Sequence, residues 1–495
     1  MKIGWSIKDI SLDEPMSLPG QGHLRISEGI LDPVCVTALC IDGGEGKDKV
    51  IFLAADMLAA TGIQEIDELA RKRCPDLPHY VLVMNGTHTH TTGSKNETKP
   101  TSPDGKPIYS GLKYREFVME SAAEAVCEAW ENRTEGGVSY GYGYAVVAHS
   151  RRVIYFDDTS LRGFTQSLSP NGHGVMYGNT NDAMFSHYES GADHFLNAMY
   201  TFDAEGKLTG IVANVPCPSQ VSEMMTKLSA DYWHDVREAV KAEFGENIYV
   251  LPQCAAAGDL SPRILHYKAA QARRMKLKYG LEYDPKGGNL QFNKCVAERK
   301  DIAQRIVAGL REIYSWAKTD IKTDCAVKHL SKATVLDKRM VTEEEKAWCE
   351  NKIQELADQI PDPAAVDPEV YRKQKSRYDS VKNRNMRVIA KYDEQKNEPT
   401  IEMLLHVVQI GEIAFATNRF ELYQDFMHRI QARSPFMQTF VVQLAGAIGG
   451  SYLPTERGVA NKGYSACIFD NVVGPEGGQQ LVEQTLEMLG QLKAK

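Results

Sequence analysis

The sequence predicts a mixed α/β fold in which central β-sheets are flanked by helices. Short apolar, β-branched runs alternate with amphipathic helical patterns through the first half of the chain, and strand patterns return near the C-terminal end. Between them, residues 267–395 are rich in charge and in helical periodicity, which favours a helical insertion. The 495 residues are enough to bury a large core. We therefore expect a single domain over residues 1–495 with a helical insertion or subdomain at 267–395.

Each element of the first half is predicted from its own pattern. Residues 50–54 and 80–84 are apolar throughout, which is typical of strands that are buried on both faces. Residues 112–130 carry apolar side chains at helical spacing and predict a long amphipathic helix. An aromatic alternation after residue 138 predicts a strand. Strands are also predicted at 208–215 and 248–251, with a helix at 230–243 between them.

The second half begins with helices and ends with strands. Thr342 and Glu345 form the spacing of a capping box, which predicts that a helix begins there. Residues 403–409 and 413–417 are apolar runs separated by Ile410-Gly411-Glu412, which predicts a hairpin. A helix at 421–432, a strand at 438–444 and a final helix carrying Leu481, Leu486, Leu489 and Leu492 complete the prediction.

Composition excludes several classes of protein. The net charge of −8 argues against nucleic acid or an anionic membrane as the main partner. No run of about 18 apolar residues is present, so we expect no transmembrane helix. The N-terminus lacks the pattern of a secretory signal, and the ten cysteines are scattered without a CxxC pair. These features predict a cytoplasmic protein with reduced thiols.

The segment Asn85-Gly86-Thr87-His88-Thr89-His90 follows a predicted buried strand directly. Residues i and i+2 share a face in extended chain, so both imidazoles can point into one cavity. An HxH pair at a strand end is a recurrent way to offer imidazole to zinc. A polar loop with two exposed histidines explains the local sequence equally well.

Two further segments follow strands. Cys217 is bracketed by Pro216 and Pro218, which restrict φ on both sides of the thiol. A thiolate there could bind zinc or act as a nucleophile, although a buried inert thiol fits this segment better on local sequence alone. The run from Gln253 to Arg263 contains Gly-Asp-Leu-Ser-Pro, a tight turn that would place Ser261 and nearby amides toward a ligand.

A fourth set of residues comes from the C-terminal part of the chain. It consists of residues 418–421, residues 449–456 and Tyr464. Each piece alone predicts only the start of a helix or a glycine turn. Tyr452 and Tyr464 are twelve residues apart.

In their order along the chain, these segments resemble the catalytic domain of neutral/alkaline non-lysosomal ceramidases, zinc-dependent amidases that cleave the N-acyl bond of ceramide. The resemblance lies in Thr87-His88-Thr89-His90-Thr91-Thr92-Gly93 and in Ala257-Gly258-Asp259-Leu260-Ser261-Pro262. The opening residues and Phe52-Leu53-Ala54-Ala55-Asp56 are also similar. The resemblance covers most of the chain outside the helical insertion, and it implies the same mixed α/β catalytic-domain fold.

The resemblance also implies a site. Its zinc ligands fall on His88, Glu421 and Tyr452, and Cys217 stands where the family has its second zinc-binding histidine. A thiolate can replace imidazole but makes zinc a weaker Lewis acid. The remaining catalytic groups fall on His90, Tyr464, Arg151 and Ser261, with Arg152 as the neighbour of Arg151 and with Asp56 and Asp231 as supports that orient ligands. We interpret Ser261 as a turn residue or substrate ligand rather than a nucleophile.

These residues predict a zinc-dependent hydrolase that cleaves an amide, ester or lactone bond with activated water. The polar loop after His90 is unsuited to a lipid tunnel, and the family's signal peptide and C-terminal immunoglobulin-like domain have no counterpart here, so we expect a small polar substrate. Two alternatives stay open. One is a metal-dependent lyase or isomerase acting on a sugar-derived hydroxy-ketone or acid, and the other is a non-catalytic zinc-binding protein. The sequence leaves the oligomeric state open, including a homo-oligomer.

Overall fold

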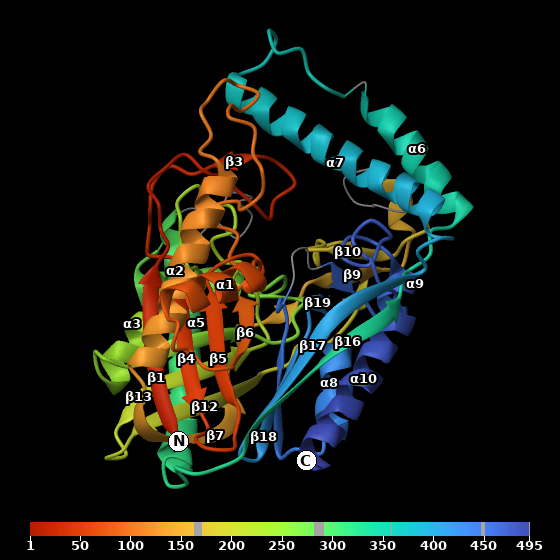
Figure 1. Ribbon diagram of the computed structural model, residues 1–495. Coiled ribbons are helices and arrows are strands. Elements are labelled where there is room, and N and C mark those ends of the chain that lie inside the picture. The colour runs from red at the N-terminus through yellow and green to blue at the C-terminus, as the bar shows by residue number, and fades with distance from the viewer. Residues whose placement is uncertain (163–170, 282–291, 358, 447–450, 495) are drawn as a thin grey trace.

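A computed structural model describes residues 1–162, 171–281, 292–357, 359–446 and 451–494. It contains an eight-stranded sheet of order β14-β13-β12-β7-β1-β4-β5-β6 and a four-stranded sheet of order β16-β17-β18-β20. Figure 1 shows helices on the outer sides of these two sheets. The predicted mixed α/β class is therefore confirmed.

The eight-stranded sheet holds most of the predicted first-half strands. Its central strand β4 is buried at every position because helices cover one face and the second sheet covers the other. The strands are β1 (Lys2–Asp9), β4 (Cys35–Asp42), β5 (Lys49–Ala55), β6 (Val81–Gly86), β7 (Thr134–Tyr144), β12 (Phe195–Asp203), β13 (Leu208–Val215) and β14 (Tyr249–Cys254). The helices on its outer face are α1 (Ile63–Arg73), α2 (Gly111–Glu131), α3 (Tyr232–Phe244) and α5 (Phe292–Ala317).

The four-stranded sheet packs face to face on the larger one. Phe52 of the large sheet lies 4.8 Å, centroid to centroid, from Phe415, which in turn lies 4.5 Å from Phe440. The other face of the small sheet is covered by α8 (Gln424–Arg433) and α10 (Pro475–Ala494). Its strands are β16 (Val327–Asp337), β17 (Thr400–Ile410), β18 (Ile413–Thr417) and β20 (Gln438–Val442). The two sheets and their outer helices thus form an αββα sandwich.

Strand β16 corrects the expected helical insertion at 267–395. It lies within that range and pairs along its whole length with β17, so the range is not helical throughout. Helix α5 belongs to the outer layer of the large sheet, whereas α6 (Glu343–Ala357) and α7 (Pro368–Glu394) form a separate helical arm. Helix α4 (Lys268–Tyr279) precedes α5. The predicted capping box is present at the start of α6, where the Thr342 and Glu345 side chains bond to each other's backbone amides at 3.2 and 3.0 Å.

The predicted hairpin at 403–417 is confirmed, with Ile410 paired to Ile413. The predicted helix at 421–432 begins later, because Glu421–Leu422 instead form a short strand, β19, which pairs in parallel with β21 (Tyr452–Leu453). The remaining short elements are β2 (Ser17–Leu18), β3 (Arg25–Ile26), β8 (His149–Ser150), β9 (Arg152–Tyr155), β10 (Gly174–Met176), β11 (Phe185–Tyr188), β15 (Leu260–Ser261), α9 (Glu456–Asn461) and a 3₁₀ turn at Thr159–Arg162.

The arm of α6 and α7 lies across one end of the sandwich (Figure 1). Near its first turns, α7 is attached to the N-terminal loops by an ion pair of 3.2 Å between Arg372 and Asp104 and by a 3.0 Å bond from the Leu24 amide to Ser376 Oγ. Near its last turns, Lys391 donates to the Asn471 carbonyl at 2.9 Å. Helix α7 is therefore held at both ends. Among the described helices, none has the length and apolarity needed to cross a membrane.

Candidate active site

The end of β6 presents His88 in an unusual backbone conformation. The strand finishes at Gly86, and two residues later His88 has φ of 68°, in the left-handed region that a side chain with a Cβ rarely adopts. The His88 amide donates to the Met57 carbonyl at 2.9 Å, which ties the turn to the segment after β5. A strained, buried histidine held by the backbone is a common feature of functional sites.

Both nitrogens of His88 have partners. Nδ1 lies 2.8 Å from the Leu58 carbonyl oxygen, and because a carbonyl only accepts, Nδ1 carries a proton. Nε2 lies 3.2 Å from Oε2 of Glu421. Two lone pairs would repel at this distance, so a proton or a cation must lie between Nε2 and the carboxylate. A histidine whose Nδ1–H is fixed by a carbonyl is the usual arrangement of a metal-binding imidazole.

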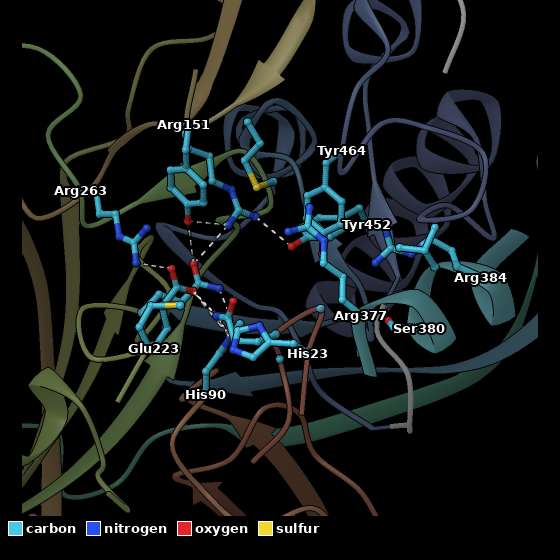
Figure 2. A pocket seen from close by; sticks show the side chains of 18 of the residues that line it. His23, His90, Arg151, Glu223, Arg263, Arg377, Ser380, Arg384, Tyr452 and Tyr464 are labelled. Carbon is cyan, nitrogen blue, oxygen red and sulfur yellow. Dashed lines mark hydrogen bonds and ion pairs between the residues drawn. The ribbon is translucent and has the colours of Figure 1, made fainter. Parts of the chain in front are cut away.

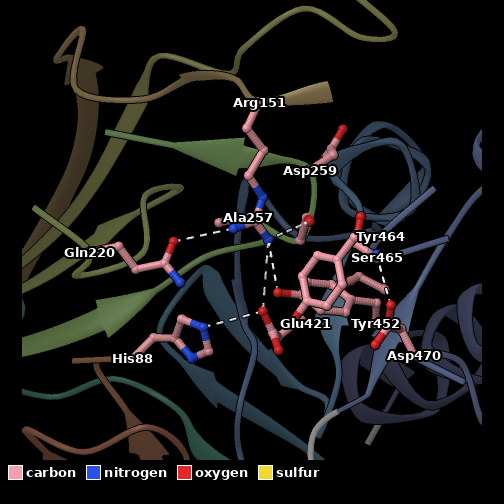
Figure 3. Close-up of polar contacts among 12 residues, drawn as sticks. His88, Arg151, Gln220, Ala257, Asp259, Glu421, Tyr452, Tyr464, Ser465 and Asp470 are labelled. Carbon is pink, nitrogen blue, oxygen red and sulfur yellow. Dashed lines mark hydrogen bonds and ion pairs between the residues drawn. The ribbon is translucent and has the colours of Figure 1, made fainter. Parts of the chain in front are cut away.

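Glu421 and Tyr452 are brought together by the register of two short strands. The β19–β21 pairing places them directly opposite each other. Arg151 lies against both, with Nη2 3.2 Å from the Tyr452 hydroxyl and 3.8 Å from Glu421 Oε2 (Figure 3). Burial alone would raise the pKa of Glu421, but His88 and Arg151 outweigh it, and the pKa lies below its ordinary value. Glu421 is therefore ionised.

The guanidinium of Arg151 is fixed by further bonds. Nη2 donates to the Gly258 carbonyl at 2.8 Å, and Nη1 donates to the Gln220 side-chain oxygen at 3.2 Å. Gly258 belongs to the glycine–aspartate turn singled out in the sequence, and a Cβ there would lie 2.3 Å from the Glu421 carbonyl oxygen, so only glycine fits. The turn thus brings the 258–261 segment, Arg151 and Glu421 together.

His90 lies beside this group and faces the pocket. Gln220 donates through Nε2 to His90 Nε2 at 2.8 Å, while Nδ1 lies 3.7 Å from Glu223 Oε2. Burial first, and then the positive charges of His88 and nearby arginines, hold the pKa of His90 well below its usual range. His90 is therefore neutral and placed to accept the hydrogen bond from Gln220.

Tyr464 lies next to Tyr452, with the two ring centroids 5.6 Å apart in an edge-to-face arrangement. Burial raises the pKa of both phenols. Each hydroxyl therefore keeps its proton in the absence of a bound cation and can donate a hydrogen bond. Figure 3 shows both rings on the same side of Glu421.

Cys217 is not part of this group. Its thiol is fully buried in the apolar cluster beneath α3 and α5, where it lies 3.6 Å from the Val147 carbonyl oxygen and 3.7 Å from the Pro218 carbonyl oxygen. Burial raises the pKa of the thiol well above its ordinary value, so it stays protonated. The contacts of Cys217 therefore favour the inert-thiol alternative over the expected role as a ligand.

Two other residues named from the sequence, Ser261 and Asp56, have different surroundings. Ser261 is buried at the end of β15, its Oγ accepts the Arg263 amide at 3.2 Å, and it does not line the pocket. Asp56 forms an ion pair of 2.7 Å with Arg237 and does not contact His88.

Asp231 and Arg152 both hold backbone in place. Asp231 accepts the amides of residues 221 and 222 at 3.3 and 2.6 Å and so fixes the loop that carries Gln220. Arg152 is fully buried, pairs with Glu189 and donates to the Tyr464 carbonyl at 2.7 Å. Its guanidinium therefore supports the Tyr464 loop from behind and does not face the pocket.

Three side chains of this group are the ones that could hold a zinc ion. Within the residues that the structure describes, no three side chains drawn from His, Cys, Asp and Glu form a metal-binding cluster. His88 and Glu421 converge, however, and the backbone register sets Tyr452 opposite Glu421, so its phenol could be a third donor. Three protein ligands and an open position are the composition of catalytic zinc sites.

A pocket of about 530 Å³ lies beside this group (Figure 2), and Tyr452 lines it whereas His88 and Glu421 do not. Among the residues named from the sequence, Arg151, His90, Tyr452 and Tyr464 line it. Sequence reasoning missed Gln21, His23, Tyr177, Glu223, Arg263, Arg377, Ser380 and Arg384, which line it as well. These residues come from segments distant in the chain, and no local motif marks them. The glycines Gly449 and Gly450 of the fourth set lie outside the described residues.

Comparison with known proteins finds similarity in structure only. No family model and no curated protein sequence matches the chain. The crystal structure of neutral ceramidase from Pseudomonas aeruginosa matches with a TM-score of 0.64 and 15% identity over 99% of this chain and 75% of that one. A structure described as ceramidase complexed with C2 matches with a TM-score of 0.64 and 14% identity over 100% of this chain and 75% of that one. The chain thus has a ceramidase-like fold.

Proposed function

We propose that the protein is a hydrolase that cleaves an amide bond, or an ester or lactone bond, of a small polar molecule in the pocket beside His88. The observation that carries this proposal is the convergence of the His88 imidazole, the Glu421 carboxylate and the Tyr452 phenol, with Arg151 in contact with two of them. Of these residues, Tyr452 and Arg151 line the pocket. The ceramidase-like fold supports the same reaction class.

The proposal includes a zinc ion held by His88, Glu421 and Tyr452. The imidazole nitrogen, the carboxylate oxygen and the phenol oxygen are atoms of the types that zinc binds in catalytic sites. Bound zinc would supply Lewis-acid activation of a carbonyl group and of water. Because Nδ1 of His88 is fixed by the Leu58 carbonyl, the imidazole can meet a cation only through Nε2.

The chain's own residues would do the rest. Arg151 presents a fixed guanidinium to the pocket, which suits the stabilisation of negative charge developing on a carbonyl oxygen. The protonated hydroxyl of Tyr464 is a hydrogen-bond donor for the same oxygen or for the leaving group. His90 accepts from Gln220 and so keeps the Gln220 oxygen directed at Arg151.

The test is a turnover screen with N-acyl amides, esters and lactones bearing polar groups. We expect hydrolysis of at least one class by the zinc-loaded protein and its loss in Glu421→Gln, whereas Glu97→Gln, at an exposed glutamate outside the pocket, keeps it. If no class is hydrolysed while sugar-derived hydroxy acids take up deuterium from solvent at carbon, the lyase or isomerase alternative replaces this proposal.

A further inference from the structure

The pocket carries far more positive charge than the reaction requires. Among the described residues that line it are four arginines, namely Arg151, Arg263, Arg377 and Arg384, and one carboxylate, Glu223. Glu223 is already ion-paired with Arg263, and the Glu421 carboxylate lies behind the lining against Arg151. Against the effect of burial, Asp470 raises the pKa of Arg384, although Asp470 does not line the pocket. Within the described residues Arg377 has no such carboxylate, so its charge needs a different explanation.

Both of these arginines come from one face of α7. Arg377, Ser380, Val381 and Arg384 follow the i, i+3, i+4, i+7 spacing of a helix face, and all four line the pocket. Seven residues of helix span about 10 Å, so the two guanidinium groups are offered along the pocket rather than at one point. Figure 2 shows both residues on the side of the pocket opposite Arg263 and Glu223.

The position of this face is fixed. Arg372 and Ser376, just before Arg377, bond to Asp104 and to the Leu24 amide at 3.2 and 3.0 Å. Arg384 packs on the Tyr464 ring, 5.6 Å from its centroid, and on the Phe469 ring at 5.0 Å. The arm thus holds Arg384 directly beside the tyrosine proposed to act in catalysis.

Arg377 has no partner within the described part of the chain: it makes no hydrogen bond or ion pair, and it is exposed. The pKa of His23, on the N-terminal loop that faces α7, depends on the charges around it. Its pKa is lowered first by burial and then by Arg25, Lys373, Arg377 and Arg372. The region between α7 and that loop therefore favours negative charge.

We infer that the substrate is an acidic small molecule whose oxyanion group, a carboxylate or a phosphate, is bound by Arg377 and Arg384 of α7. Guanidinium groups suit both kinds of oxyanion because they donate paired hydrogen bonds. The inference rests on the proposed function in placing the substrate in this pocket. It assigns the α6–α7 arm a role in substrate specificity, with Arg384 orienting the anionic end near Tyr464.

The experiment measures binding by titration calorimetry, without turnover. The probes are N-acetylglycine, its neutral counterpart N-acetylglycinamide, and the phosphate ester of N-acetylethanolamine. We expect at least one acid to bind about tenfold or more tightly than the neutral amide, with affinity falling as salt rises. Binding of the carboxylate alone or of the phosphate alone identifies the oxyanion.

The variants localise the effect. Arg377→Gln and Arg384→Gln should each reduce about tenfold the ratio of the affinity for the acid to the affinity for the neutral amide. Arg387→Gln should leave this ratio unchanged, because Arg387 is an exposed arginine of α7 that does not line the pocket. The inference is overturned if neither acid binds more tightly than the amide, or if the double variant keeps the full preference. An acid preference without hydrolysis of any substrate would instead remove the proposed function and leave this inference standing.

Discussion

Nε2 of His88 lies 3.2 Å from Oε2 of Glu421, while Nδ1 of the same ring lies 2.8 Å from the Leu58 carbonyl oxygen. The ring therefore meets an acceptor on each side. A neutral imidazole has only one N–H, so one of the two contacts requires an added proton or a cation. This relationship between two residues 333 positions apart in the chain is the basis of the proposed metal site.

Replacing Glu421 tests the carboxylate side of that contact. Glu421→Gln keeps the shape of the side chain but removes its negative charge, so zinc affinity should fall about 100-fold or more. The measurement is competition with a fluorescent zinc chelator, and Glu97→Gln, at an exposed position, is the matched control. Equal affinity in the two variants would show that Glu421 is not a ligand.

Replacing Cys217 or Cys254 with serine should have the same effect on stability and on zinc retention. Both thiols are fully buried, and Cys254 donates to the Cys217 carbonyl at 3.5 Å, so each serine variant places a hydroxyl in an apolar cluster. We expect Cys217→Ser and Cys254→Ser each to lower the free energy of unfolding by about 1–2 kcal/mol and to retain zinc equally. Urea unfolding and metal analysis check both points. Zinc loss confined to Cys217→Ser would return Cys217 to the ligand set.

Tyr464→Phe separates catalysis from packing. The ring contacts with Tyr452 and Arg384 remain in the variant, whereas the hydroxyl is lost. Turnover on a substrate found by the screen should fall about 100-fold, the scale of losing one transition-state donor, with zinc content and melting temperature unchanged. Near-normal turnover would make Tyr464 a structural residue of the pocket wall.

Lys95 should make stability depend on pH. Its ammonium group donates to the Ala59 carbonyl at 3.0 Å, beside the Leu58 carbonyl that orients His88, and burial lowers its pKa to about 7. The unfolded chain holds this proton up to its ordinary pKa of 10.5, so it binds more protons than the folded chain between these values, and stability should rise with pH through that window.

Lys95→Met removes this titration. The variant should be more stable than the wild type below neutral pH, by on the order of 5 kcal/mol, and the difference should shrink as pH rises toward about 10. Urea midpoints measured across this range give the comparison, with Lys99→Met at an exposed site as the control. A difference independent of pH would contradict the lowered pKa.

The fold could be predicted from the sequence where periodicity is local. Residues 208–215 form a strand with the expected bounds, and the capping box of Thr342 and Glu345 is present. Strand β16 was missed, because its alternation of exposed and buried residues lies in a charge-rich segment and is stabilised only by pairing with β17. Tertiary pairing decides such strands, and it has no local signature.

The order of the motifs along the chain predicts that five residues share one site, and in the structure these residues contact one another or line the same pocket. They are His88, Arg151, Glu421, Tyr452 and Tyr464. The assignment of Cys217 does not match the geometry, because a proline-bracketed strand end fixes the backbone and not the face on which the thiol lies.

The basic residues of α7 could not be assigned from the sequence. The helix is rich in charge on several faces, and nothing in its periodicity distinguishes Arg377 and Arg384, which line the pocket, from Arg387, which does not. The pocket-lining face is defined only once the arm packs across the end of the sandwich, and that contact joins segments far apart in the chain.

The most direct test of the proposed metal centre is the zinc content of the purified wild-type chain, measured by elemental analysis after zinc loading and desalting. The same measurement is made on a His88→Ala variant whose circular dichroism spectrum matches that of the wild type. The account predicts about one zinc per wild-type chain and little in the variant, because His88 can reach a cation only through Nε2. Well under half an equivalent in the wild type, or equal zinc in both proteins, would contradict the proposed metal centre.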